Sequence, residues 1–170
     1  SQIDFLRRSA SEAGVSFGGL SKEFVKFSAA MSSAQVPLVE SNALFAAITR
    51  ASGTLGLSAE ETGGALNALG QMASKGTVSM EELRQQLGDR LPGAFGLVAK
   101  GLGITEAQLV KLVESGNLAA RDMFPALTSA LGNMKGEVYG LAPAFERLKG
   151  ALTEVAQGMG DAGMSSALTQ

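Results

Sequence analysis

The stretch SAEETGGALNALGQMASKGTVSMEELRQQLGDRLPGAF, from Ser58 to Phe95, decides the fold that we predict for this chain. It contains two helix starts of one kind, because Ser58 and Ser79 are each followed three residues later by a glutamate. In such a capping box the serine oxygen accepts from an unpaired backbone N–H, and the glutamate reaches back to the N-cap N–H. Gly76 and the run Leu91-Pro92-Gly93 are typical of helix ends. The stretch therefore predicts two helices that are separated by a glycine and closed by a proline turn.

Apolar residues keep a helical period through most of the chain. Thr105 and Gln108 form a third capping box, and Gly116 ends the helix that it starts. No stretch alternates strictly enough to predict a sheet. We therefore predict an all-α fold, a compact domain of about seven or eight short helices over residues 1–136. The apolar stripes lie at Leu20, Phe24, Phe27, Met31 and Ala34; at Leu44, Phe45, Ile48 and Ala51; at Ala65, Leu66, Leu69, Met72 and Ala73; at Met80, Leu83 and Leu87; at Leu109, Leu112 and Val113; and at Phe124, Leu127, Leu131 and Met134.

The last part of the chain, residues 137–170, carries a different pattern. Six apolar residues repeat at spacings of 4 and 3, as in the a/d seam of a coiled coil. The pattern predicts an amphipathic helix at about 141–157, followed by a flexible end. Two interpretations stay open, which are one more helix packed on the domain and an oligomerisation seam that continues in a longer chain. The seam residues are Leu141, Phe145, Leu148, Leu152, Val155 and Met159.

Composition excludes several classes of functional site. The chain has no cysteine and no histidine, so a thiolate or imidazole metal site and a catalytic triad that uses histidine cannot form. The formal net charge is −2, which predicts neither nucleic-acid nor membrane-surface binding. No apolar run approaches the roughly 20 residues that a membrane span needs. We expect no cofactor, no metal and no membrane contact from this segment.

Two motifs suggest chemistry and are better explained by structure. The pairs Glu60-Glu61 and Glu81-Glu82 could serve as acid and base, but each lies in a first helical turn, where negative charge is favoured. The run GLVAKGLG, from Gly96 to Gly103, lacks the Lys-Ser/Thr pair of a phosphate-binding loop. Asp89 and Arg90 flank the proline turn and predict a surface ion pair or a partner contact. The sequence therefore supplies no catalytic residue.

The segment SKGTVSMEELRQQLGDRLPGAF, from Ser74 to Phe95, resembles the conserved domain near the N-terminal side of tail tape measure proteins of long-tailed bacteriophages and prophages. Flanking segments resemble that domain as well, so the similarity covers roughly residues 10–135. The residues that carry the motif are Ser79, Glu82, Leu83, Leu87, Gly88, Arg90, Leu91, Pro92, Gly93 and Phe95.

The resemblance implies a structural protein without turnover. Tape measure proteins set tail length, are held by tail assembly chaperones in the host cytoplasm, and lie in the lumen of the tail tube. The implied partners are proteins of the tube, of the tip or baseplate, and the chaperones, with a homo-oligomer as a further alternative. The chain begins at Ser1, without methionine, and we expect it to be part of a longer chain. Two other functions remain open, which are a helical muralytic enzyme domain and a generic helical adaptor.

Overall fold

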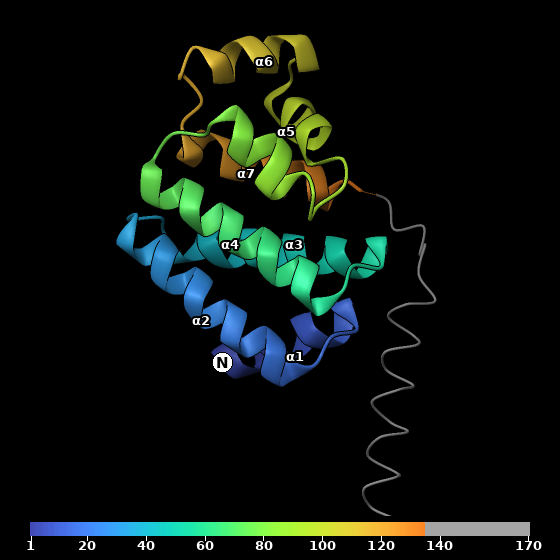
Figure 1. Ribbon diagram of the computed structural model, residues 1–170. Coiled ribbons are helices and arrows are strands. Elements are labelled where there is room, and N and C mark those ends of the chain that lie inside the picture. Colours follow the sequence, from blue (N-terminus) through green and yellow to red (C-terminus); the bar gives the residue numbers. More distant parts are fainter. Residues whose placement is uncertain (135–170) are drawn as a thin grey trace, which may run out of the picture.

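A computed structural model describes residues 1–134, which form eight helices and, within that range, no strand (Figure 1). The predicted all-α fold and the predicted number of helices are therefore confirmed for this part of the chain. The predicted helix at 141–157 and its seam lie outside the described residues. In chain order the helices are α1 (Gln2–Ala13), α2 (Phe17–Ser33), α3 (Leu38–Leu55), α4 (Ala59–Lys75), η1 (Glu82–Leu87), α5 (Ala94–Leu102), α6 (Glu106–Glu114) and α7 (Ala120–Gly132).

The helices stack in successive levels from one end of the molecule to the other (Figure 1). α1 and α2 lie at one end, α3 and α4 cross the middle, and η1, α5 and α7 follow, with α6 at the far end. The most extensive contacts join α2 to α4 and α5 to α7, followed by α1 to α3 and α3 to α7. α3 is thus the central helix, which contacts the levels on both sides of it.

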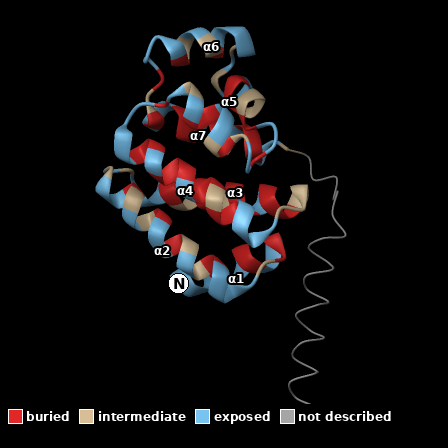
Figure 2. Ribbon diagram, in the orientation of Figure 1, coloured by how far each residue is buried: buried red, intermediate tan, exposed pale blue. Residues whose placement is uncertain are grey.

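Buried residues, red in Figure 2, occur at every one of these levels, and the apolar ones among them form one continuous core. Phe45 of α3 is fully buried and contacts three other rings, with its centroid 4.9 Å from that of Phe24 in an edge-to-face arrangement. Phe5 of α1 and Phe27 of α2 complete this aromatic cluster. Such pairs add about 0.5–1.5 kcal/mol each beyond the burial of their area. The predicted stripes are confirmed as buried except at Ala34, Met80, Leu112 and Met134, which are half-buried.

The predicted helix starts at Ser58 and Thr105 and the predicted helix end at Gly76 are confirmed. Ser58 and Thr105 each form a complete capping box, with Glu61 and Gln108 respectively. Gly76 ends α4 in the left-handed conformation, at φ 81°, which a residue with a side chain rarely adopts. The sequence stripes did not include α1, although its N-cap Ser1 forms another capping box with Asp4.

Some helical glycines serve close packing rather than helix ends. Gly53 lies inside α3, which continues to Leu55 and has Gly56 as its left-handed cap. A Cβ at Gly53 would lie 2.8 Å from the Cα of Ala13, so this glycine lets α1 and α3 approach each other. Pro125 lies inside α7, in its second turn.

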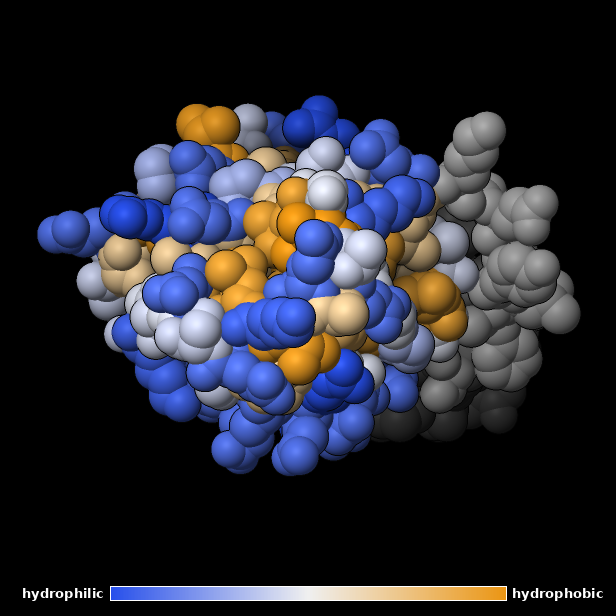
Figure 3. All heavy atoms as spheres, turned by 90° about the horizontal axis from the view of Figure 1, so that it is seen from above, coloured by the Kyte–Doolittle hydropathy of each residue, from blue (hydrophilic) through white to orange (hydrophobic). Residues whose placement is uncertain are grey.

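The far end of the molecule presents apolar side chains between polar ones. Viewed from above, where α6 is nearest, hydrophobic residues gather near the centre of the surface with hydrophilic residues around them (Figure 3). The half-buried apolar residues of α5, of α6 and of the loop between them are Phe95, Leu97, Leu102, Ile104 and Leu112.

Candidate functional site

The motif segment, residues 79–95, connects α4 to α5 and forms η1 on the way. Leu83, Leu87 and Leu91 insert into the core with no measurable exposure. Gly93 follows them at φ 80° and lets α5 start directly at Ala94. The remaining motif residues lie nearer to solvent: Ser79, Arg90, Pro92 and Gly93 are exposed, and Gly88 and Phe95 are half-buried, whereas Glu82 is buried. The segment thus combines three core anchors with an outward polar face.

η1 is a π-helical turn, which the apolar spacing did not predict. The N–H of Gly88 donates to the carbonyl of Leu83, five residues earlier, at 3.1 Å. A Cβ on Gly88 would lie 2.2 Å from the carbonyl oxygen of Arg84, so only glycine allows this wide turn to close. π-helical turns are rare in proteins, and many of those that occur lie at functional sites. The expected α-helix from Ser79 is therefore corrected to a π-helical turn over Glu82–Leu87.

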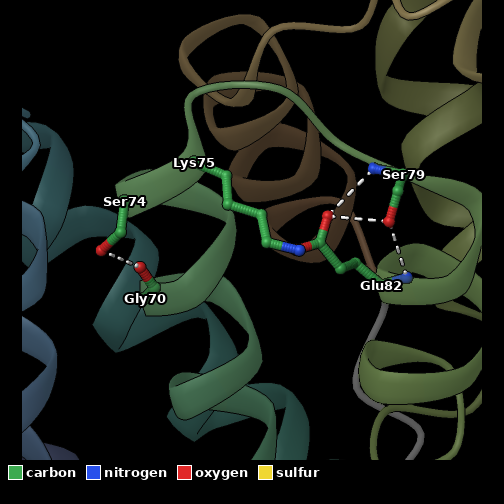
Figure 4. A network of polar contacts seen from close by, with 5 residues as sticks. All are labelled: Gly70, Ser74, Lys75, Ser79 and Glu82. Atoms are coloured by element: carbon green, nitrogen blue, oxygen red, sulfur yellow. Dashed lines mark hydrogen bonds and ion pairs between the residues drawn. The ribbon is translucent and has the colours of Figure 1, made fainter.

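Glu82 is a buried carboxylate that joins two segments (Figure 4). Its Oε2 accepts from the backbone N–H of Ser79 at 3.0 Å and from the Ser79 hydroxyl at 2.9 Å. Its Oε1 lies 2.7 Å from Nζ of Lys75, in the last turn of α4. Burial by itself would raise the pKa of Glu82, but the contacts with Lys75 and Ser79 outweigh it and hold that pKa below its usual range. The hydrogen bond to Glu82 also raises the pKa of Lys75.

The link between α4 and η1 is fastened to the link between α6 and α7. The N–H of Val78 donates to the carbonyl of Leu118 at 2.9 Å, and the N–H of Ala120 donates to the carbonyl of Gly76 at 2.9 Å. These two bonds form an isolated antiparallel bridge between Thr77 and Ala119. Nothing in the sequence pattern indicated this pairing, because neither segment alternates. The bridge and the Lys75–Glu82 pair together fix the direction in which the motif segment leaves α4.

Two arginines cover the outer side of the motif segment. The guanidinium of Arg84 lies 4.1 Å from the ring centroid of Phe95, which is a cation–π contact between η1 and α5. Arg90 donates from Nη1 to the carbonyl of Gln86 at 2.9 Å. A Cβ on Gly64 would lie 2.2 Å from Nε of Arg90, so the arginine lies directly over α4 at this glycine. This contact explains a glycine in the interior of α4, and the predicted Asp89–Arg90 ion pair does not form.

In each of the pairs Glu60-Glu61 and Glu81-Glu82 the second glutamate caps the start of a helical segment, as the sequence predicted. Glu61 accepts from the backbone N–H of Ser58 at 2.7 Å, and the bonds with Ser58 lower its pKa. Glu82 is committed to Ser79 and Lys75. Within residues 1–134 no group of three acidic side chains is placed to hold a metal ion. Gly96–Gly103 belongs to α5 and its C-cap, so it is not a phosphate-binding loop.

A shallow groove of about 330 Å³ runs between α2 and α4. Phe27 and Leu66 form its apolar floor, and Glu23, Lys26 and Lys75 lie along its rim. Charges of both signs border it, and its two floor residues are almost fully buried. The groove therefore offers little apolar area to a ligand. No helix in the described part is long and apolar enough to cross a membrane.

Comparisons with known proteins identify relatives of this chain. A family model described as "Tape measure protein" matches residues 1–162, so the match extends well beyond the roughly 10–135 seen from the sequence motif. A "Probable tape measure protein" of Salmonella phage Felix O1 (isolate Felix O1-VT1) is 41% identical over 86 residues. That alignment covers 51% of this chain and 12% of the relative, so the chain spans a small part of the relative's length. No solved structure matches the chain.

Proposed function

Since the chain belongs to the tape measure protein family, we propose that it is a structural and assembly module of a phage tail tape measure protein. The family match over residues 1–162 is the observation that carries this proposal. In this role the module helps to set tail length and to organise assembly of the tail tube. The muralytic and adaptor alternatives gain no support from the family match.

The folded body suits anchoring or docking better than measuring. As one straight helix, residues 1–134 would span about 200 Å at 1.5 Å per residue. As a compact domain of this size they have a radius of gyration of about 14 Å. A body that stays folded therefore adds little length per residue, and a relative of which this chain covers 12% has ample further chain for a ruler. We place the ruler in the rest of the parent protein.

The proposal includes partners and a location. The partners are proteins of the tail tube, of the tip or baseplate, and tail assembly chaperones, and the site of action is the tube lumen after assembly in the host cytoplasm. The exposed outer side of the motif segment, with Arg84, Gln85 and Arg90, is the surface that we assign to docking. Its backbone is held by the core leucines and by the Lys75–Glu82 pair. A rigid surface of this kind binds with little loss of conformational entropy.

A substitution that keeps the number of residues tests the anchor hypothesis. Gly101→Val in the parent gene would disrupt the α5–α7 packing without shortening the chain, because a side chain at Gly101 meets the backbone of Ala126. Gly18→Ala is the matched control, because a Cβ there meets nothing within 4 Å. We expect no tails, or tails of scattered length, from the first phage and normal tails from the second, as measured by electron microscopy.

A deletion of the codons for residues 1–170 separates the remaining alternatives. Tails that shorten in proportion to the deleted residues, together with normal tails from Gly101→Val, would show that the segment is part of the ruler and would refute the anchor role. Normal tails that fail to infect would move the function to a later step and favour the enzyme alternative. Release of peptidoglycan fragments by the purified chain would test that alternative directly.

A further inference from the structure

The first four helices form two hairpins of one kind. α1 and α3 each end at a glycine in the left-handed conformation, Gly14 and Gly56, both at φ 69°. Two residues later a serine, Ser16 or Ser58, caps a helix of 17 residues, which is α2 in the first hairpin and α4 in the second. The second hairpin thus repeats the first with a shift of 42 positions, from Gly14 to Gly56 and from Ser16 to Ser58. Hairpins that repeat in this way stack on one another in repeat proteins and present extended binding surfaces.

α2 and α4 pack side by side and run in the same direction (Figure 1). A Cβ at Gly63 of α4 would lie 3.1 Å from the carboxyl carbon of Glu23 on α2. A Cβ at Gly70 would lie 3.1 Å from the Cβ of Ala30. The two contacts follow the same order on both helices and are separated by the same number of positions, so the helices are parallel and in register. They therefore form one continuous seam.

Two adjoining hollows lie along this seam and share Glu23 in their walls. The larger, of about 330 Å³, lies between residues 23–30 of α2 and residues 66–75 of α4. The smaller, of about 240 Å³, lies between residues 15–23 and residues 59–63. We call the two together the α2–α4 groove. A helix of 17 residues is about 25 Å long, which is the length of about seven or eight residues of extended chain.

Two side-chain amides of α4, those of Asn67 and Gln71, are exposed and line this groove. Neither amide hydrogen-bonds another group within residues 1–134, whereas the neighbouring Ser74 donates to the carbonyl of Gly70 at 3.0 Å (Figure 4). An amide side chain offers both donor and acceptor atoms, as the main chain of a peptide does. Positions four apart on a helix are about 6 Å apart along its axis, and main-chain groups on one side of an extended chain recur every two residues, at about 6.6–6.8 Å. The two amides therefore match alternate residues of an extended peptide.

The shape of the groove favours an extended chain with small side chains. α2 and α4 touch where Ala30 meets Gly70, so the groove is shallow there, and it has too little depth for a helix about 10 Å wide. Its floor residues Phe27 and Leu66 are almost fully buried, so large apolar side chains would find little area to cover. Peptides that bind in an extended form obtain most of their affinity from main-chain hydrogen bonds.

Charges at the two ends of the groove are of opposite sign. Glu60 lines it near the N-terminal end of α4, and Lys75 lines it at the C-terminal end. Lys75 pairs with Glu82, but its side chain is 63% exposed and its ammonium has three donors, so it can also bind a carboxylate of a ligand. Complementary charges fix the position of a bound chain. The ends therefore select a basic residue beside Glu60 and an acidic residue beside Lys75.

We propose that the α2–α4 groove binds an extended peptide segment of a partner protein. In this complex Asn67 and Gln71 pair with alternate main-chain groups, small side chains lie between the helices, and the basic and acidic ends lie beside Glu60 and Lys75. This assignment goes beyond the proposed function, which places docking on the motif segment, and does not depend on it.

An NMR titration of the isotope-labelled full chain tests the groove. The probe is the acetylated and amidated peptide KASASAE, which has the predicted charges at its ends and small residues between them. We expect chemical-shift changes in the amide signals of residues 15–30 and 59–75, and none in α6 or α7. Transferred NOEs should show the strong contacts between successive Hα and N–H atoms of an extended chain. A helical bound peptide, shift changes away from the groove, or no change at about 10 mM peptide would overturn the proposal.

Substitutions separate recognition by the two amides from unspecific surface contact. Asn67→Ala with Gln71→Ala should weaken binding at least about tenfold, because the hydrogen bonds of both amides are lost. Alanine is a good helix former, so α4 should stay folded, which circular dichroism verifies. Gln85→Ala is the matched control, because it removes an exposed amide of η1 that does not line the groove, and it should leave binding unchanged.

A modified probe tests the main-chain contacts from the side of the ligand. The same peptide with N-methyl groups on its five inner residues lacks the main-chain donors there, and we expect it to bind at least about tenfold more weakly. Equal binding of the methylated and unmethylated peptides, or of the double variant and the unsubstituted protein, would show that the amides do not recognise a main chain and would refute the assignment.

Discussion

The contact between α5 and α7 at Gly101 makes a sharp prediction about stability. A Cβ added at Gly101 would lie 2.0 Å from the carbonyl oxygen of Ala126 and 2.5 Å from its carbonyl carbon. Real Cβ atoms essentially never approach closer than 3.0 Å, so the two helices must separate by about 1 Å or more. The obstacle is backbone, which cannot rotate away as a side chain could. Gly101→Ala should therefore destabilise the fold although alanine is the better helix former.

The magnitude follows from two opposing contributions. Overpacking of a well-packed interface costs about 1–3 kcal/mol, and a gap of 0.5–1 Å forfeits a quarter to a half of each dispersion contact. The α5–α7 interface is among the two most extensive in the described chain, so we take the upper end of that range. Replacement of glycine by alanine in a helix returns up to about 1 kcal/mol. The net effect is a loss of about 2 kcal/mol, which lowers Tm by about 4–8 °C.

Thermal and urea unfolding followed by circular dichroism measure this loss. Gly18→Ala provides the control, because open space surrounds that position and the substitution should be neutral or stabilising by up to about 1 kcal/mol. Gly70 is an intermediate case, with the Cβ of Ala30 at 3.1 Å from the added atom. We expect the order of Tm to be Gly18→Ala, Gly70→Ala, Gly101→Ala, from highest to lowest. If Gly101→Ala melts at or above the unsubstituted protein, the close approach of α5 and α7 is wrong.

Three further predictions concern the caps and the motif segment. The folded pKa of Glu82 lies below its usual 4.5, so its charge stabilises the fold above that pH and stops doing so as the pH falls through the folded value. Glu82→Gln should therefore cost about 2 kcal/mol at pH 7 and nothing once the pH is below the folded pKa of Glu82. A pH-independent difference in the free energy of unfolding would contradict this. Ser58→Ala should cost about 1 kcal/mol in urea unfolding because α4 loses its cap, whereas Ser74→Ala, which only loses a bond to the carbonyl of Gly70, should change stability by less than about 0.5 kcal/mol. A double-mutant cycle of Arg84→Gln and Phe95→Leu should give a coupling of about 0.5–1 kcal/mol, and zero coupling would show that the cation–π contact does not form in solution.

Local signals in the sequence predicted the helices well because each signal acts within one turn. Ser58 and Glu61, or Thr105 and Gln108, satisfy backbone groups three residues away, so no distant part of the fold is needed to interpret them. The apolar stripes were equally reliable in the central helices, where one whole face is buried. Their residues at the ends of helices, such as Ala34 and Met134, are only half-buried, because a terminal residue has neighbours on fewer sides.

Distant contacts explain what the sequence did not predict. Gly64 lies in the interior of α4, and Arg90, 26 positions further along the chain, occupies the space that a side chain at Gly64 would need. The Thr77–Ala119 bridge joins two links whose residues show no strand pattern, so no single segment contains the information. The same holds for Lys75 and Glu82, which belong to different helices.

Gly88 shows that the motif residues determine the backbone conformation of the segment from Ser79 to Phe95. If the segment from Ser79 to Leu87 were an α-helix, Gly88 would be an ordinary terminal glycine. In the structure its N–H donates to the carbonyl of Leu83, five residues earlier, and the turn is wider than an α-helical one. Around this turn Leu83, Leu87 and Leu91 are all buried in the core, while Arg84 and Arg90 remain exposed. A motif in which glycine, proline and leucine set the backbone and arginine faces solvent is suited to present a rigid surface. Such a surface is what the docking role that we propose for this segment requires.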